Sequence, residues 1–284
     1  MTWRRFALIL VALGLLLLGW CYWGATADPV VREAQVRLPG WPAGAAPVRV
    51  VLISDLHVSA PDNPPERIAR IVERINGLRP DVVLIAGDFL TEKSVSTHNY
   101  GADEIAAALA GLRPRLGTFA VLGNHDYWID GPGMRRALTA RGIRVLANEA
   151  VQTGPLVIGG LDDAFTGHNR DAATHAAMRR LPGARILLSH SPDPFATLPG
   201  DIALMLAGHT HCGQIRLPLI GALKTMSAYG QRYACGLVVE NGRSLIVTAG
   251  LGTTAVPLRL LAPPDLWVVT VGPLRPAAAP GPRR

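Results

Sequence analysis

The chain has 284 residues, of which 49% are hydrophobic and 17% charged, enough for one sizeable globular domain. Its formal net charge of +7 is carried mainly by arginine. This charge indicates either a compositional bias on a solvated surface or attraction to anionic lipid headgroups or a phosphorylated substrate. The sequence has no dense basic run and only 6% aromatic residues, which argues against a nucleic-acid partner.

An uncharged apolar segment, residues 6–24, lies near the start of the chain. A helix of this length crosses a bilayer core of roughly 30 Å, and aromatic residues at both ends suit the two membrane interfaces. Arg4 and Arg5 lie in the preceding n-region, residues 1–5, and favour a cytoplasmic N-terminus. We therefore predict a single-pass signal anchor in the inner membrane, with the domain that follows on the extracytoplasmic side.

A cleaved signal peptide is the alternative interpretation, because residues 25–27 (Ala-Thr-Ala) match a cleavage pattern. The apolar segment is longer than the usual core of roughly 7–15 residues and ends in bulky aromatic residues, which favours the anchor. Both interpretations place the rest of the chain outside the cytoplasm. The three cysteines do not form a disulfide framework, but a single Cys212–Cys235 bridge remains open in an oxidising compartment.

Residues 25–47 are rich in Pro, Gly and Ala and are predicted to be a tether. Short apolar strands then alternate with helices that have one apolar face. The strands are predicted at 48–53, 81–86, 119–122 and 143–146, and the helices at 65–78, 103–112 and 134–141. This alternation indicates an α/β domain.

Further strands are predicted at 156–161, 185–189 and 202–207. After about residue 214 the pattern changes to strands with Gly-rich turns and no long helix, at 235–240, 244–248 and 266–271. Asn241-Gly242 predicts a hairpin turn between two of them. We therefore expect two sheets packed together with helices outside, in a domain spanning 48–272. The Pro/Ala-rich tail, 273–284, is predicted to be disordered.

Polar motifs follow several of the apolar strands, where ligands bind in open α/β folds. They are Asp55-Leu56-His57, Gly87-Asp88, Gly123-Asn124-His125-Asp126, Ser189-His190 and Gly208-His209-Thr210-His211. If the chain is extended, Asp55 and His57 point the same way, as do His209 and His211. One motif alone is more often a capped turn or a hydrogen-bonded strand end. Together they hold five of the 8 histidines, which predicts a metal site.

The mixture of imidazole and carboxylate suits Mn, Fe, Zn, Co or Ni better than Mg or Ca. Two such ions, about 3.5–4 Å apart, can activate a water molecule and hold phosphoryl oxygens at the same time. That is the chemistry of phosphoester hydrolysis. A mononuclear zinc hydrolase needs only about three protein ligands, fewer than the candidates in this sequence.

In these motifs and their order, from about residue 48 to 271, the chain resembles the calcineurin-like metallophosphoesterase superfamily. It looks closest to the bacterial membrane-associated phosphodiesterase branch. The hallmarks of that branch appear in residues 208–214 (Gly-His-Thr-His-Cys-Gly-Gln), 250–252 (Gly-Leu-Gly) and 257–259 (Pro-Leu-Arg). The resemblance implies a four-layer α/β/β/α sandwich of two mixed sheets, here preceded by an N-terminal transmembrane helix.

The resemblance also implies a role for each motif residue. One metal ion would be held by Asp55, His57 and His211, and the other by Asn124, His190 and His209. Asp88 would bridge the two ions together with a hydroxide that attacks phosphorus in line. The remaining roles fall to His125 as general acid or charge stabiliser, to Asp126 as the group that orients His125, and to Arg259 as a ligand for a substrate phosphate. Mn is the favoured ion, with Fe, Zn, Co and Ni as alternatives.

Two positions remain open. Cys212 stands where many relatives have Gly, so its thiol either touches a metal ion, is oxidised, or fills a tight turn. Asp162 and Asp163 end another predicted strand and either reach the site or form a turn.

We predict metal-dependent hydrolysis of a phosphoester, with a phosphodiester favoured, at the membrane surface. The resemblance suggests a lipid-linked substrate such as UDP-2,3-diacylglucosamine. That precursor would be met in the cytoplasm, so an extracytoplasmic domain leaves envelope phospholipid or wall polymer open. The expected partners are the lipid bilayer and the phosphoester, and the sequence gives no information on oligomeric state.

Two alternatives have the same fold. A catalytically silent phosphate-binding module is disfavoured because no ligand of the motif set is missing. A nuclease is disfavoured because no nucleic-acid surface is evident.

Overall fold

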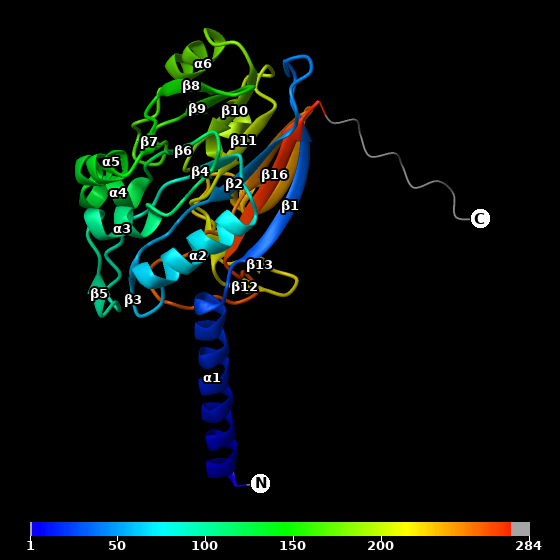
Figure 1. Cartoon of the computed structure of the whole chain (residues 1–284). Helices are drawn as coiled ribbons and strands as arrows, with labels where there is room; N and C mark the ends of the chain where they lie inside the picture. Colours follow the sequence, from blue (N-terminus) through cyan, green and yellow to red (C-terminus); the bar gives the residue numbers. More distant parts are fainter. Residues whose placement is uncertain (1, 274–284) are drawn as a thin grey trace.

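The computed structural model describes residues 2–273. The apolar N-terminal segment forms helix α1 (Trp3–Thr26), which projects from the rest of the molecule (Figure 1). This helix is long and apolar enough to cross a membrane, as judged by length and composition. The predicted span, 6–24, lies within it. The predicted disordered tail, 273–284, lies outside the described residues except for Pro273.

Two six-stranded mixed sheets form the centre of the molecule (Figure 1). The first has the order β1-β16-β2-β4-β6-β7, with β1 (Val30–Arg37), β2 (Val48–Ile53), β4 (Val82–Ile85), β6 (Thr118–Ala120), β7 (Ile143–Val145) and β16 (Asp265–Gly272). The second has the order β14-β15-β11-β10-β9-β8, with β8 (Glu149–Thr153), β9 (Leu156–Gly160), β10 (Ala184–Leu188), β11 (Leu204–Ala207), β14 (Gly236–Glu240) and β15 (Arg243–Val247). Each sheet contains parallel and antiparallel pairs.

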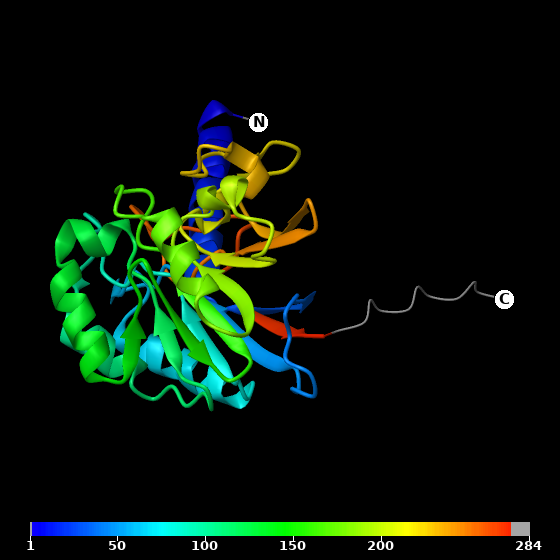
Figure 2. The same ribbon diagram turned by 90° about the horizontal axis from the view of Figure 1, so that it is seen from above.

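Helices cover the outer faces of both sheets (Figures 1 and 2). The first sheet is covered by α2 (Pro65–Gly77), α3 (Ala102–Leu109), α4 (Asn124–Ile129) and α5 (Gly131–Ala140). The second is covered by α6 (Asp171–Arg179) and the 3-10 helices η1 (Asp193–Thr197) and η3 (Gly230–Tyr233). The expected α/β/β/α sandwich is thereby confirmed. The remaining elements are two short strand pairs, β3 (Ser59–Ala60) with β5 (His98–Asn99) and β12 (Arg216–Leu217) with β13 (Gly221–Ala222), and the 3-10 turn η2 (His211–Gly213).

Strand β2 shows how the sequence produces these layers. Val50 and Leu52 pack in the core between the two sheets, whereas Val51 and Ile53 pack against the helices. Both faces of the strand are buried, which is why its residues are almost continuously apolar. Burial of each such side chain contributes about 1.5–3 kcal/mol.

The predicted tether, 25–47, is wrong for much of its length. Residues 30–37 form β1, which pairs in parallel with β16 from Val30↔Asp265 to Arg37↔Gly272. Ala34 and Val36 of β1 pack on the core between the sheets. Only residues 27–29 separate α1 from β1, so the helix leads directly into the domain, which begins before the predicted residue 48.

Candidate metal centre

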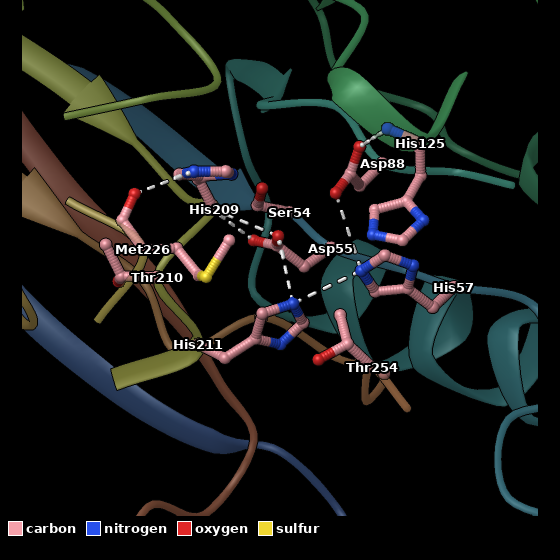
Figure 3. Close-up of polar contacts among 12 residues, drawn as sticks. Ser54, Asp55, His57, Asp88, His125, His209, Thr210, His211, Met226 and Thr254 are labelled. Carbon is pink, nitrogen blue, oxygen red and sulfur yellow. Dashed lines mark hydrogen bonds and ion pairs between the residues drawn. The ribbon is translucent and has the colours of Figure 1, made fainter. Parts of the chain in front are cut away.

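The predicted ligands converge where strands of both sheets end, and Figure 3 shows most of them pointing into one centre. They come from the ends of β2 (Asp55, His57), β4 (Asp88), β10 (His190) and β11 (His209, His211) and from the start of α4 (Asn124). All seven side chains are buried. The structure therefore brings together every residue that the motifs predicted as a ligand.

Asp55, His57 and His211 form one group, in which one ligand atom from each residue lies within 4.8 Å of the others. His57 Nε2 lies 3.2 Å from His211 Nε2, and His211 Nε2 lies 3.4 Å from Asp55 Oδ1. These are the three residues predicted to hold the first ion.

Asp88, His190 and His209 form the second group, with Asn124 beside it. His190 Nε2 lies 3.2 Å from Asp88 Oδ2, 3.1 Å from Asn124 Oδ1 and 3.1 Å from His209 Nδ1. Asp88 Oδ2 also lies 3.5 Å from His57 Nε2 of the first group. Asp88 thus lies between the two groups, where a bridging ligand is expected.

Hydrogen bonds at the outer side of the centre assign the tautomers of three rings. The partners are backbone carbonyls: Leu90 for His57 Nδ1 at 3.2 Å, Ala86 for His190 Nδ1 at 2.6 Å, and Met226 for His209 Nε2 at 3.1 Å. A carbonyl only accepts, so these ring nitrogens carry the hydrogen in the neutral ring. The other nitrogen of each ring then presents a lone pair to the centre. Fixing a ligand histidine through its outer nitrogen is typical of metal sites.

With the rings neutral, these nitrogens lie 3.1 to 3.5 Å from oxygens of Asp88 and Asn124 and from neighbouring ring nitrogens. A contact between two acceptors is unfavourable unless a proton or a metal cation lies between them. The donor set combines imidazole, carboxylate and amide oxygen, which fits divalent transition-metal ions.

The charges around His190 support the same conclusion. Burial alone would lower the pKa of His190, but Asp88 and Asp55 raise it to about 10. Burial lowers the pKa of His57 and of His211 well below the ordinary value, so both are neutral near pH 7. The centre therefore favours positive charge beside Asp88, which a metal ion supplies as well as a proton does.

The ligands do not converge in the way the extended-chain argument predicted. Asp55 (φ 51°) and His57 (φ 42°) are in the left-handed region, and so are His209 (φ 71°) and His211 (φ 51°). Each strand ends in a tight turn, and the turn rather than the strand alternation aims the side chains. Such backbone is uncommon outside glycine and is concentrated at functional sites.

Glycine at positions 123 and 208 permits close packing of the ligand segments. A Cβ at Gly123 would lie 2.8 Å from His190 Cε1 and closer still to Asp88. A Cβ at Gly208 would overlap Ser54 and Asp55. These glycines are part of the motifs because any side chain would displace a ligand.

His125 lies in the wall of a cavity beside the ligands. Its ring makes edge contacts with His57, at a centroid separation of 4.8 Å, and with Trp128 at 4.9 Å. Its backbone N–H donates to Asp88 Oδ1 at 2.9 Å. Burial lowers the pKa of His125, so its ring is neutral near pH 7. The ring is only partly buried and therefore accessible to a molecule in the cavity.

The expected contact between Asp126 and the His125 ring is not present among the described residues. Both carboxylate oxygens of Asp126 are occupied by backbone amides. The donors are Asp88 N at 3.0 Å, Phe89 N at 2.9 Å, Leu90 N at 3.0 Å and Gly123 N at 2.9 Å. Asp126 therefore holds the two loops that carry Asp88 and Asn124.

The prediction that Arg259 binds a substrate phosphate is also corrected. Its side chain is buried, and its guanidinium donates to backbone carbonyls. The acceptors are Ala249, Gly250, Gly252 and Ala262. Gly250 and Gly252 pack against the segment of Asp55 to His57, so Arg259 supports the centre from behind.

The cavity beside the ligands has a volume of about 650 Å³. Its walls include residues that no motif indicated, among them Lys93 and Lys224, the only lysines of the chain. Lys93 is buried, and its Nζ lies 2.7 and 2.9 Å from the two carboxylate oxygens of Asp62 and 3.2 Å from Thr253 Oγ1. The one sequence feature that could have indicated these positions is the rarity of lysine.

The structure shows the surroundings of the two open positions. Cys212 and Cys235 form a disulfide, so Cys212 is not a free thiol beside the ligands. Asp163 accepts hydrogen bonds from Phe165 N at 3.3 Å and Thr166 N at 2.8 Å, which identifies a turn, and its charge also acts to raise the pKa of His190. Asp162 accepts one from the hydroxyl of Tyr127 at 2.6 Å.

Comparison with known proteins gives one consistent family. A family model described as calcineurin-like phosphoesterase matches residues 48–213. A transmembrane protein with metallophosphoesterase domain from Danio rerio is 31% identical over 83% of this chain and 56% of its own length, so the chain spans little more than half of that relative. The metallophosphoesterase YkuE from Bacillus subtilis (strain 168) is 31% identical over 81% of both chains, and one from Aquifex aeolicus (strain VF5) is 31% identical over 79% of this chain and 85% of its own. With its seven ligand residues in one buried centre, the chain belongs to the calcineurin-like phosphoesterase family.

Proposed function

We propose that this chain is a dinuclear metal-dependent phosphoester hydrolase, preferring a phosphodiester, that works at the extracytoplasmic surface of the inner membrane. Membership of the phosphoesterase family supports phosphoester hydrolysis. The observation that carries the dinuclear assignment is the position of Asp88 between two separate groups of ligands. A mononuclear site would use only one of these two groups of ligands.

Two divalent ions would be held by Asp55, His57 and His211, by Asn124, His190 and His209, and by Asp88 between them. When bound, they supply Lewis-acid polarisation of the phosphoryl oxygens and a water nucleophile at neutral pH.

The residues of the chain itself perform the remaining tasks. The neutral ring of His125 retains one N–H and faces the cavity, where it donates to the leaving oxygen or a phosphoryl oxygen. Lys224, in the wall of the same cavity, supplies positive charge to the phosphoester.

Two observations support the membrane placement. Relatives named as transmembrane proteins match the chain, and α1 has the length and composition of a membrane span. The Cys212–Cys235 disulfide suits an oxidising compartment and thus an extracytoplasmic domain.

Contacts at the C-terminal end of α1 support an anchor that is retained. Cys21 and Ala25 are buried, and Arg259 N donates to Cys21 O at 2.9 Å. Arg67 Nη2 donates to Ala27 O at 2.7 Å. Cleavage after Ala27 would remove all of these contacts.

Hydrolysis of bis-p-nitrophenyl phosphate and p-nitrophenyl phosphate by the full chain, with Mn²⁺ added or chelated, tests the proposal. We expect turnover that chelation abolishes, faster on the diester. His125→Ala should retain metal and lose activity about 100-fold, whereas Asp88→Ala should lose metal as well. The exposed His98, outside the centre, provides the control His98→Ala, which should retain both. Retention of metal with no turnover of either ester would instead indicate a phosphate-binding module.

A further inference from the structure

Exposed apolar side chains gather on two segments beside the domain end of α1. We call residues 214–226, which contain the β12–β13 hairpin, the hairpin segment, and residues 254–261 the loop segment. Their exposed large apolar side chains are Leu219, Ile220, Leu223, Met226, Val256 and Leu261. Neither segment contains an acidic residue, and the hairpin segment carries Arg216 and Lys224. Figure 1 shows the hairpin next to the point where α1 meets the domain, and the view in Figure 2 agrees.

The tip of the hairpin exposes large apolar side chains, which is unfavourable if only water surrounds it. Leu219 is fully exposed (relative accessibility 108%), and Ile220 is 63% exposed. Leu219 also has a φ of 67°, in the left-handed region that disfavours a branched side chain. Leu261 combines exposure with a φ of 52° in the same way. Apolar side chains held outward at a backbone cost indicate contact with an apolar environment outside the domain.

Backbone hydrogen bonds place both segments at the depth of the α1 interface. Arg259 N donates to Cys21 O at 2.9 Å, which joins the loop segment to α1. Leu260 N donates to Gln214 O at 3.0 Å, which joins the loop segment to the hairpin segment. Cys21 precedes Gly24, the last residue of the apolar segment, by about 4.5 Å along the helix. The loop segment therefore contacts α1 within the apolar segment, residues 6–24.

The surroundings favour a bilayer over a protein partner as the occupant of this surface. Trp20, Tyr22 and Trp23 of α1 lie at the same level, as aromatic residues do at a membrane interface. Arg216 and Lys224 would face anionic headgroups with no carboxylate in either segment to oppose them. The surface is continuous with a helix that already has the properties of a membrane span.

Both segments also form part of the wall of the metal cavity. Ile215, Leu223 and Lys224 of the hairpin segment and Thr254 and Ala255 of the loop segment line the cavity. The wall of the cavity thus combines exposed apolar side chains of the two segments, a lysine and the predicted metal ligands. That combination suits an amphiphile with its phosphoester towards the metal centre and its acyl chains towards the membrane.

We propose that the hairpin and loop segments insert shallowly into the leaflet that α1 enters, and that the cavity mouth receives the phosphoester of a lipid headgroup directly from the bilayer. The membrane contact stands on the geometry of α1 and the two segments. The assignment of a lipid phosphoester rests on the proposed function.

A depth measurement tests the membrane contact without using activity. The full chain is placed in nanodiscs of phosphatidylethanolamine and phosphatidylglycerol, with an environment-sensitive fluorophore at Leu219→Cys in a Cys21→Ser background. The control, Val239→Cys, labels an exposed β14 position that pairs with Ser244, at the end of the strands remote from the centre. Lipid-borne doxyl groups should quench the label at 219 and leave that at 239 unchanged. Water-like emission at 219, or a blue shift without quenching, would overturn the contact, and the latter would indicate a protein partner instead.

A pair of substrates tests the entry of lipid. Leu219→Asp/Ile220→Asp should hydrolyse hexadecyl p-nitrophenyl phosphate in nanodiscs about tenfold more slowly than the unaltered chain, because two apolar contacts with the bilayer are lost. Its turnover of soluble bis-p-nitrophenyl phosphate should change less than about twofold. Val239→Asp should alter neither rate. Equal rates on the membrane ester would refute lipid entry from this surface. Failure of the unaltered chain on both esters would refute the proposed function, while the depth measurement would still decide the membrane contact.

Discussion

Four backbone amides point at the carboxylate of Asp126, two at each oxygen. Burial and the charge of Asp88 raise the pKa of Asp126 to about 7, whereas the amide donors favour the ionised form. A proton on either oxygen would compete with two N–H donors, so the geometry fits the carboxylate. Asp126 thus fixes the loop of Asp88 through the backbone.

Asp126→Asn should lower the free energy of unfolding by about 2–3 kcal/mol, because an amide NH₂ would face two backbone donors. Metal content should fall with it, since the loop of Asp88 loses its support. Chemical denaturation and metal analysis measure the two effects. Asp130→Asn is the matched control: Asp130 accepts from Gly133 N as the N-cap of α5, a role that asparagine fills equally well, so this variant should lose little stability and no metal. Equal effects of the two variants would contradict the role given to Asp126.

Lys93 and Asp62 form a buried ion pair that supports one wall of the cavity. Lys93→Met would leave the Asp62 carboxylate buried without its partner and should destabilise the fold by about 3–5 kcal/mol. The double variant Lys93→Met/Asp62→Leu should recover much of this loss, because no unpaired charge remains. Thermal and denaturant unfolding of the unaltered chain, the two single variants and the double variant give the coupling energy between Lys93 and Asp62. Lys224→Met removes the other lysine, which has no ion pair among residues 2–273, and should leave the free energy of unfolding nearly unchanged. A loss of stability comparable to that of Lys93→Met would contradict the argument.

The ligands could be predicted from sequence because each follows an apolar strand in a short motif, and strands of one domain end together. Other features of the centre depend on contacts that the motifs do not encode. The carbonyl of Met226 fixes the ring of His209 from a distant loop. Arg259 was assigned to a phosphate because a conspicuous arginine suggests an anion, but sequence does not show whether its donors face a cavity or the backbone.

At the scale of elements, the sequence predicted helices, strands and turns best where the local residue pattern was strong. β2 has the predicted bounds, 48–53. Asn241 and Gly242 form the predicted turn between β14 and β15, both with positive φ as that turn type requires. β1 was missed because its valines stand between Pro/Gly-rich segments, and because its partner β16 lies at the far end of the chain. Pairing between strands so far apart in the sequence leaves no pattern in the residues of either strand.

The segment of His211 is fastened by a disulfide. Cys212–Cys235 joins η2 to the segment before β14, and Thr210 Oγ1 donates to Ala234 O at 2.7 Å beside it. Cys212→Ser/Cys235→Ser should lower the free energy of unfolding by about 3 kcal/mol, as expected for a loop of this length. Denaturant unfolding with and without reductant measures it. Reductant should destabilise the unaltered chain and leave the variant unchanged, and no effect on the unaltered chain would contradict the prediction.

At the scale of the whole molecule, the absence of a free tether has consequences for how the domain meets the membrane. α1 ends at Thr26, and β1 begins at Val30. Contacts from Cys21 and Ala27 to the domain fix the direction in which the helix leaves. The domain is therefore held in one orientation to α1, and residues of the hairpin and loop segments, which lie beside the helix, line part of the cavity. A flexible tether would have let the centre reach substrates at many distances, whereas this attachment restricts it to one depth.

The same attachment predicts where the chain can be shortened. A chain that begins at Asp28 keeps β1 and should fold, with the loss of the contacts to α1 alone. A chain that begins at Pro39 loses β1, which exposes the edge of β16 and leaves Asp265 without Arg32, its partner at 2.6 Å. It also loses the buried Val36 and Leu38, so its free energy of unfolding should be lower by about 3 kcal/mol or more. Denaturant unfolding of the two chains compares them, and equal stability would show that β1 is a detachable tether after all.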